Sequence, residues 1–571
     1  MVSPTLIRRA DVARGAELNT ETKRLFQLIH SGKKGANDVD DDTPKISVSE
    51  MISKISFVYE KIRNAVDFEE EHLLRKNAIV RILKRQVVIE GVLKETSSEK
   101  LAQHLLTELI RAGYLPNNKL PETKIKETAI LLEKYILLKN YSVARINSLL
   151  NIKTDLGQAK DLIKEKNSTI NWILAMAACE IEENFNLNRV KHHVVSNMFA
   201  ILSKNLELPN SLPYQENLEI QTYLSINRVF MRFDKDMLGL ILFKYYNANW
   251  SGIDRDNLSL AEIKQIADSL PVLRQAINDQ LTHPLVKPLD RLVKVYSLYY
   301  NVLLENVQGD PVKAYEELSR DEGKFLKGVK KTCETKYKKE NSRLWRKAIR
   351  SIIYIFFTKS IFVLLIEIPA IHWFNEPLNV FALGINIAFP AVLLFFIVLM
   401  SRTPSKKNTD KIIAGVKEIS LAGMERKQPI LVPGPKKRQK AANFFFNLLY
   451  TAAFFVSTYF ILKVLSWLNF NWVSMTIFMF FLAFVSFFSI VVTKDVKNLI
   501  IVQKRDSFLG FLVDLFYMPI IAVGKWLSGK ASKLNFFVFI FDFIIEAPFK
   551  VLLDVAEDWT RYVRERKDNM L

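Results

Sequence analysis

The sequence predicts an all-α protein: a helical cytoplasmic domain, a polytopic membrane domain of two transmembrane hairpins, and C-terminal interfacial amphipathic helices. Glycine (18) and proline (19) are sparse among 571 residues, whereas long apolar and charged side chains abound, which favours helices over turn-rich β folds. Apolar positions in the N-terminal region recur at helical spacing, and no segment alternates convincingly as a strand. Four long apolar runs lie in the C-terminal part of the chain.

Each of these four runs is long enough to cross the ~30 Å hydrocarbon core of a bilayer as a helix. They are Ile352–Ile371, Leu378–Met400, Phe444–Trp467 and Trp472–Val492. Only residues 372–377 separate the first two runs and only residues 468–471 the last two, so each pair predicts a helical hairpin. Four core helices of a soluble protein are a poorer interpretation, because soluble cores rarely supply four runs of this length.

Basic residues flank both hairpins and are missing from their tips. Eleven Lys and Arg occur between Lys324 and Arg350, and eleven more between Arg402 and Lys440. The positive-inside rule therefore predicts a multi-pass protein of the cell (cytoplasmic) membrane with both termini cytoplasmic and both tips outside. Because this charge abuts apolar runs, the net charge of +20 indicates topology and contact with anionic lipid headgroups rather than nucleic-acid binding.

These patterns divide the chain into seven parts. They are a mobile arm (1–46), a helical cytoplasmic domain (47–320), a basic juxtamembrane helix (321–350), hairpin 1 (351–400), a basic cytoplasmic loop (401–442), hairpin 2 (443–493), and interfacial or re-entrant helices with a charged C-terminus (494–571). A bundle is favoured over a solenoid for the helical domain because no repeat period is visible.

Apolar spacing and helix-end signals place individual helices in the N-terminal region. The expected helices are Glu21–His30, one after the capping-box pattern Ser47-x-x-Glu50, one through Leu73–Leu83, then Ser98–Ala112, Pro121–Tyr141, Ser168–Phe185, Arg189–Leu206, Tyr214–Tyr246, Ser259–Asn278 and Pro288–Asn306. A lysine-rich helix over Tyr315–Lys347 is expected to run into the first apolar run.

Two ionisable residues, Lys359 and Glu367, interrupt the first apolar run. Each costs about 2.5–3.5 kcal/mol if it faces lipid near the bilayer centre. Eight residues separate them by about 12 Å along a helix, so they are not expected to touch. They either line one shared polar interior or snorkel to opposite interfaces. Glu367, with Asn386 and Pro390 of the second run, predicts a polar site inside the bundle, used for helix packing or for an ion or proton.

Two further apolar stretches, Phe508–Leu527 and Leu534–Leu553, carry charges and are expected to be interfacial or re-entrant rather than spanning. Asp514 lies in the first. In the second, charges recur at three- or four-residue steps and predict a helix with one charged side and one apolar side. This interfacial stripe comprises Asp542, Glu546, Lys550 and Asp554. The alternative is an ordinary amphipathic helix packed on the cytoplasmic domain.

Sequence signatures of catalysis and of cofactor or metal binding are not found. There is no P-loop pattern, no Gly-x-Ser-x-Gly elbow and no His-Glu-x-x-His motif, and the two cysteines, Cys179 and Cys333, lack zinc spacing. His192 and His193 are adjacent, so on a helix they point about 100° apart and do not converge on one ion. We therefore expect no cofactor, no metal site and no catalytic residues.

Three functions stay open. The first is a membrane-anchored interaction or scaffold protein whose helical domain binds a cytoplasmic protein partner. The alternative is a transport, channel or lipid-handling protein with a pathway between the hairpins, which four spans would support better if the chain formed a homo-oligomer. A membrane enzyme acting on lipid through Asp514, Asp542 and Glu546 is the third, and the sequence leans away from it.

Overall fold

The computed structural model describes most of the chain. The described residues are 18–34, 44–64, 70–86, 97–151, 155–185, 188–252, 260–401, 404–422, 426, 428–434, 440–502 and 508–533, with Val555, Trp559, Tyr562, Val563 and Arg566. These residues are almost entirely helical, and their strands are limited to the two-residue parallel pair β1 (Leu206–Glu207) and β2 (Ile430–Leu431), in register Leu206 with Ile430. The predicted all-α class is therefore confirmed. The predicted stripe at 542–554 lies outside the described residues.

The chain forms two compact units, and each is described by itself. The helical unit comprises residues 27–297, 428–435 and 536–571. The membrane unit comprises residues 1–26, 298–427 and 436–535. Two helices, α1 (Thr20–Lys34) and α11 (Val286–Gly309), contribute residues to both units.

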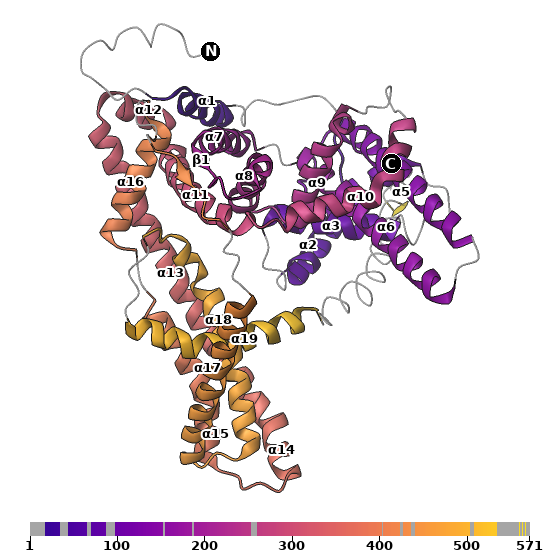
Figure 1. The fold of residues 1–571 in the computed structure, drawn as a ribbon. Helices are drawn as coiled ribbons and strands as arrows, with labels where there is room; N and C mark the ends of the chain where they lie inside the picture. Colours follow the sequence, from indigo (N-terminus) through magenta and orange to yellow (C-terminus); the bar gives the residue numbers. More distant parts are fainter. Residues whose placement is uncertain are drawn as a thin grey trace. The chain divides into compact units, whose positions relative to one another are not determined.

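The helical unit is built on amphipathic helices that bury their apolar faces on one another (Figure 1). Its helices are α2 (Glu50–Asn64), α3 (Glu71–Lys84), α4 (Ser98–Arg111), α5 (Thr123–Asn151), α6 (Leu156–Phe185), α7 (Arg189–Asn205), η4 (Gln215–Asn217), α8 (Leu218–Ile226), η5 (Asn227–Met231), α9 (Lys235–Tyr246), η6 (Ala248–Gly252) and α10 (Leu260–Leu281). The core joins α3, α4, α5, α6, α9 and α10.

Two local predictions for the helical unit are wrong. The single helix expected over Tyr214–Tyr246 is broken at Arg232, whose backbone is left-handed (φ 60°), and Asp234 then caps α9 by accepting from the Met237 amide. The capping box placed at Ser47 is also wrong, because α2 begins at Glu50 and the Ser53 amide donates to the Ser49 carbonyl. Short polar residues near a helix start compete for the cap, so spacing alone did not select Ser49.

The membrane unit contains four helices long and apolar enough to cross a bilayer, as predicted. Its helices are α12 (Pro311–Arg320), α13 (Glu322–Phe362), η8 (Val363–Glu367), α14 (Ile368–Trp373), α15 (Val380–Leu399), α16 (Lys406–Ser420), α17 (Lys440–Trp467), α18 (Trp472–Asn498) and α19 (Phe508–Lys533). As expected, a lysine-rich helix runs into the first apolar run, because α13 passes from one into the other. The single helix expected over Tyr315–Lys347 is wrong at its start, because α12 ends at Arg320 and Asp321 caps α13 by accepting from the Lys324 amide.

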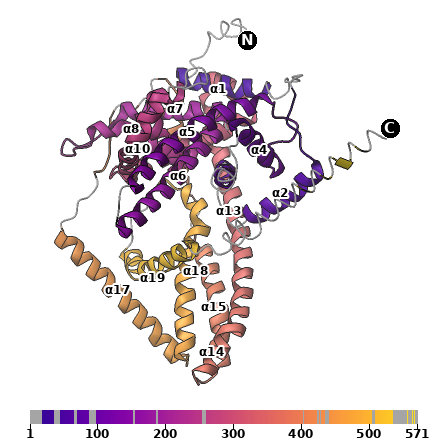
Figure 2. The ribbon, with the colours of Figure 1, turned by 90° about the vertical axis from the view of Figure 1, so that its right-hand side faces the viewer.

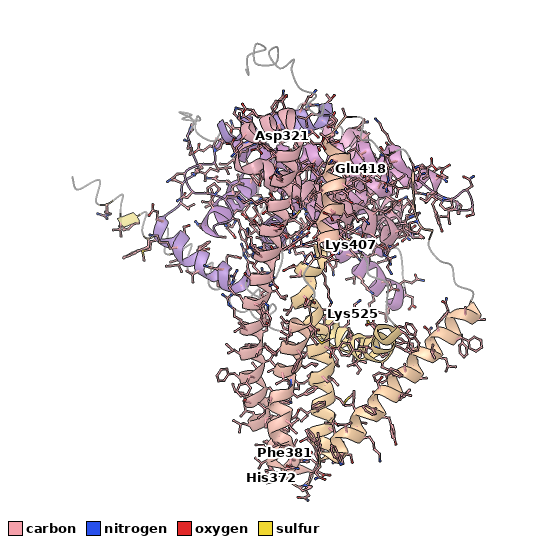
Figure 3. The ribbon with its side chains drawn as sticks, turned by 90° about the vertical axis from the view of Figure 1, so that its left-hand side faces the viewer. Asp321, His372, Phe381, Lys407, Glu418 and Lys525 are labelled. Carbon is pink, nitrogen blue, oxygen red and sulfur yellow. The ribbon has the colours of Figure 1, made fainter. Side chains whose placement is uncertain are left out.

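The two helical hairpins differ in how their arms pack. Helices α13 and α15 pack along each other and against α18, sharing a core that includes Ile355, Leu394 and Val485. In contrast, α17 diverges from α18 away from their common tip, and α19 lies between these two arms (Figure 2). Figure 3 shows His372 and Phe381 at the tip end of the unit and Asp321, Lys407 and Glu418 toward the other end.

Candidate intramembrane polar site

The predicted polar residues of the membrane helices converge on one buried cluster. The Glu367 carboxylate of η8 accepts through Oε1 from Asn386 Nδ2 (2.6 Å) and from Ser474 Oγ (2.7 Å). Its other oxygen, Oε2, lies 3.7 Å from Lys359 Nζ. Asn386 Nδ2 also donates to the Ser474 carbonyl (3.4 Å), so α13–η8, α15 and α18 all contribute to the cluster.

Direct pairing of Lys359 with Glu367 contradicts the expectation that they cannot touch. The segment between them, Val363–Glu367, is π-helical, with a wider turn than the α-helix assumed from the sequence. Because a wider turn rotates less per residue, it brings the two side chains closer to the same face of the helix. The long lysine side chain then spans much of the distance along the helix axis between the two residues. Lys359 is fully buried, so of the two sequence alternatives the structure shows a shared polar interior rather than snorkelling.

The charges of Lys359 and Glu367 are balanced by neighbouring side chains. Both side chains of the ion pair are 0% exposed, so neither charge is compensated by solvent. The Lys359 ammonium instead lies 3.8 Å from the centroid of the Phe481 ring and 5.4 Å from that of Phe362. Such cation–π contacts contribute up to about 2 kcal/mol when desolvated. The buried ammonium is therefore stabilised by the Glu367 carboxylate and by two aromatic rings.

Three polar atoms of the cluster lack a hydrogen-bond partner among the described residues. They are Lys359 Nζ, Glu367 Oε2 and Asn386 Oδ1. Buried polar atoms are normally hydrogen-bonded, and each exception costs about 1–3 kcal/mol. The cluster is thus closely packed but not fully satisfied.

Two partners of the cluster, Ser474 and Phe481 of α18, were missed by sequence reasoning. A serine one turn from a helix start carries little signal, because such residues commonly serve as caps; here Asn471 is the cap and accepts from the Ser474 amide (2.8 Å). A phenylalanine in an apolar run carries none. Pro390, expected beside the site, is buried one turn further along α15 from Asn386.

The remaining predicted site residues lie apart from the cluster. Asp514 is exposed on α19. Asp542, Glu546, Lys550 and Asp554 lie outside the described residues. The structure thus brings together Lys359, Glu367 and Asn386 and does not join Asp514 to them.

Helix α19 meets the second hairpin halfway along its arms. A Cβ on Gly524 would clash with the Ala483 carbonyl oxygen of α18, and Ser457 Oγ of α17 donates to the Phe516 carbonyl (2.9 Å). Ala483 is about 16 Å along α18 from Trp472, and a similar distance from Lys494. These contacts place α19 beside the middle of both arms of the second hairpin.

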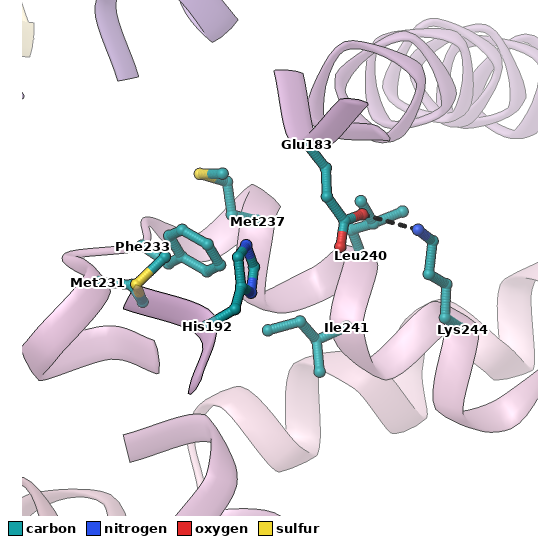
Figure 4. A pocket seen from close by; sticks show the side chains of 8 residues that line it. All are labelled: Glu183, His192, Met231, Phe233, Met237, Leu240, Ile241 and Lys244. Atoms are coloured by element: carbon teal, nitrogen blue, oxygen red, sulfur yellow. Dashed lines mark hydrogen bonds and ion pairs between the residues drawn. The ribbon is translucent and has the colours of Figure 1, made fainter. Parts of the chain in front are cut away.

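A second polar site, in the helical unit, is a small hollow of about 40 Å³ (Figure 4). His192 lines it, and Lys244 donates to Glu183 there at 2.7 Å. Burial opposes the charge on Lys244, but the carboxylates of Glu180 and Glu183 outweigh this and raise its pKa. Such a space accommodates water rather than a substrate, and within the described ranges no three His, Cys, Asp or Glu side chains are placed to hold a metal ion.

The helical unit also buries charged groups, and each has a partner. Glu182 is fully buried and accepts two hydrogen bonds from the Arg75 guanidinium (2.6 and 2.7 Å). Glu180 accepts from Tyr135 Oη (2.5 Å) and Trp250 Nε1 (3.0 Å). The burial of Glu182 and Glu180 is therefore explained by these hydrogen bonds and needs no ligand.

Comparisons with protein-family models, with curated proteins and with solved structures found no match.

Proposed function

We propose that this chain is a membrane-anchored helical interaction protein whose two hairpins form a closed anchor. The observation that carries the proposal is the complete burial of Lys359 and Glu367 against each other, against Asn386 and Ser474, and against the Phe481 ring. A conduction path needs polar groups that a solute can reach. Polar groups that face only one another instead hold helices together.

The proposal includes a topology. Exposed cations on α13 and α16, including Arg350 and Lys407, mark one end of the apolar helices, and the exposed Trp373 and Trp467 mark the other. This distribution supports cytoplasmic termini and a cytoplasmic 401–442 loop in the cell membrane. The helical unit would then present its surface to cytoplasmic proteins.

One face of the helical unit supports an interaction role. On α2, Met51, Ile55 and Val58 recur at helical spacing and are 69%, 44% and 55% exposed. An uncovered apolar stripe of this kind is typical of a protein-binding helix. We propose that it contacts the apolar surface of a protein partner.

A flux assay on the full-length chain separates an anchor from a pathway. Purified protein is reconstituted into vesicles, and proton and monovalent-cation flux is followed for the wild type and for Glu367→Gln. The anchor predicts background flux for both, with a lower membrane yield for Glu367→Gln. The matched control, Glu376→Gln near the first tip, should keep a normal yield. Wild-type flux above background that Glu367→Gln abolishes would overturn the proposal.

The second candidate, transport of a proton or small ion, is favoured by one observation. Three polar atoms that lack a hydrogen-bond partner among the described residues, Lys359 Nζ, Glu367 Oε2 and Asn386 Oδ1, lie in one cluster next to a π-helical turn. Turns of this kind frequently occur at functional sites. The same flux assay tests it.

A further inference from the structure

The outward face of α13 carries one line of exposed side chains that changes character along the helix. Apart from one adjacent pair, its members recur every three or four residues and therefore share a face. They are, in order, Lys339, Arg343, Arg346, Arg350, Ile353, Tyr354, Phe357 and Ile361. The first four are cationic and the last four are apolar or aromatic.

The packing of α13 fixes the direction of this line. Leu344, Ala348, Ile355 and Lys359 are buried on the opposite face, where α13 packs against α15 and α18. On its flank, Lys347 donates to Asp495 of α18 (2.6 Å). Rotating the helix to hide the cations would expose these buried residues, so the line faces away from the other helices of the membrane unit.

The change from cationic to apolar occurs between Arg350 and Ile353, over about 4.5 Å of helix. Whatever covers this face must be anionic or polar beside residues 339–350 and apolar beside residues 353–361. A lipid leaflet has this order along the direction of the helix. An acidic protein surface would match the cations but leave the exposed Tyr354 and Phe357 uncovered.

The length of the apolar part agrees with a bilayer. From Ile353 to Trp373 the chain advances by about 30 Å, the thickness of the hydrocarbon core. Trp373 is 85% exposed at the far end, where indole rings prefer the headgroup layer. Arg346 and Arg350 are therefore placed at the level of lipid phosphates in the opposite leaflet.

We propose that Lys339, Arg343, Arg346 and Arg350 form a binding surface for anionic phospholipid headgroups. Three of the four are arginines, whose planar guanidinium donates two parallel hydrogen bonds to a phosphate. Glu340 accepts from Arg343 Nη1 (2.8 Å) and restrains that side chain along the helix. Each cation contributes about fivefold to the local preference for anionic lipid. This inference does not rest on the proposed interaction function.

The test measures which lipids accompany the full-length protein. Wild type and variants are reconstituted into vesicles of phosphatidylcholine with a minor fraction of phosphatidylglycerol, extracted into polymer nanodiscs, and analysed for their lipid ratio. The stripe variant is Arg343→Gln, Arg346→Gln and Arg350→Gln together. The matched control, Lys327→Gln, Lys330→Gln and Lys331→Gln, removes the same charge further up the helix. Its nearest position, Lys331, is about 18 Å from Arg343 and about 28 Å from Arg350, beyond the ~10 Å screening length.

Wild type and control should be enriched in phosphatidylglycerol over the starting vesicles, with enrichment falling as salt is raised. The stripe variant should lose this enrichment, and an Arg→Lys triple variant at the same positions should keep part of it. Equal enrichment in the stripe variant and the control, or none in the wild type, would overturn the proposal. Partial retention in the Arg→Lys variant also excludes misfolding as the cause of the loss.

Discussion

Replacing Lys359 by methionine removes the ammonium from a pair in which both side chains are fully buried. Glu367 would keep its hydrogen bonds from Asn386 and Ser474 but lose its only opposite charge among the described residues. Removing one partner of a buried pair costs about 3–5 kcal/mol, whereas replacing both partners with groups of similar shape is often neutral. The single variant should therefore be destabilised by about that amount.

A double-mutant cycle tests this reasoning in the intact chain. Lys359→Met, Glu367→Gln and the combined variant are purified in detergent, and unfolding free energies are compared. The combination should be more stable than the sum of the single effects predicts, by about 2 kcal/mol or more. Additive losses would refute the pairing of the two charges, since they would show that each residue acts alone.

Three further perturbations test separate parts of the structure. Gly524→Ala should displace α19 and lower the thermal unfolding temperature, because its new Cβ would clash with a backbone carbonyl of α18. Gly529→Ala should not, because a Cβ there would meet no atom of the described residues beyond its own stretch of helix within 4 Å. Arg75→Met should destabilise the helical unit by about 3–5 kcal/mol, measured by denaturant unfolding, because it leaves Glu182 buried without its guanidinium; a change below about 1 kcal/mol would contradict this. Burial lowers the pKa of His72, so stability present above the ordinary histidine pKa should fall as the pH drops toward the folded pKa, and His72→Phe should reduce this acid slope. If stability falls equally steeply with decreasing pH in His72→Phe, groups other than His72 cause that loss.

The elements of the fold were predictable wherever one physical signal dominated. The four apolar runs are such a case, and α7 over Arg189–Asn205 matches the expected Arg189–Leu206 almost residue for residue. Prediction failed where local backbone geometry outweighed periodicity. The left-handed Arg232 splits a segment whose apolar spacing continues through the break. The second hairpin was expected as two adjacent arms, whereas its arms diverge and α19 lies between them.

The candidate site was predicted in composition but not in geometry. The cost of charge in an apolar run singled out Lys359 and Glu367 from the sequence alone, and Asn386 was named with Glu367 as a polar residue of the second run. The direct contact of Lys359 with Glu367 depends on the π-helical turn at Val363–Glu367. The cluster is completed by Ser474 and Phe481, which belong to a helix about 100 residues later in the chain. No single-sequence pattern encodes which helix faces which, so these partners required the structure.

We propose that both hairpins cross a membrane with their tips on the side opposite the basic loop. Asn375 and Asn469, each with a left-handed backbone (φ 53° and 54°), lie at the two tips, and the native Cys179 and Cys333 are buried. Intact cells carrying Asn375→Cys, Asn469→Cys or, as control, Lys407→Cys are treated with a membrane-impermeant maleimide. We expect Asn375→Cys and Asn469→Cys to be labelled in intact cells. Lys407→Cys should be labelled only after the cells are lysed. Protection of the tips in intact cells together with labelling of the loop position would contradict this proposal.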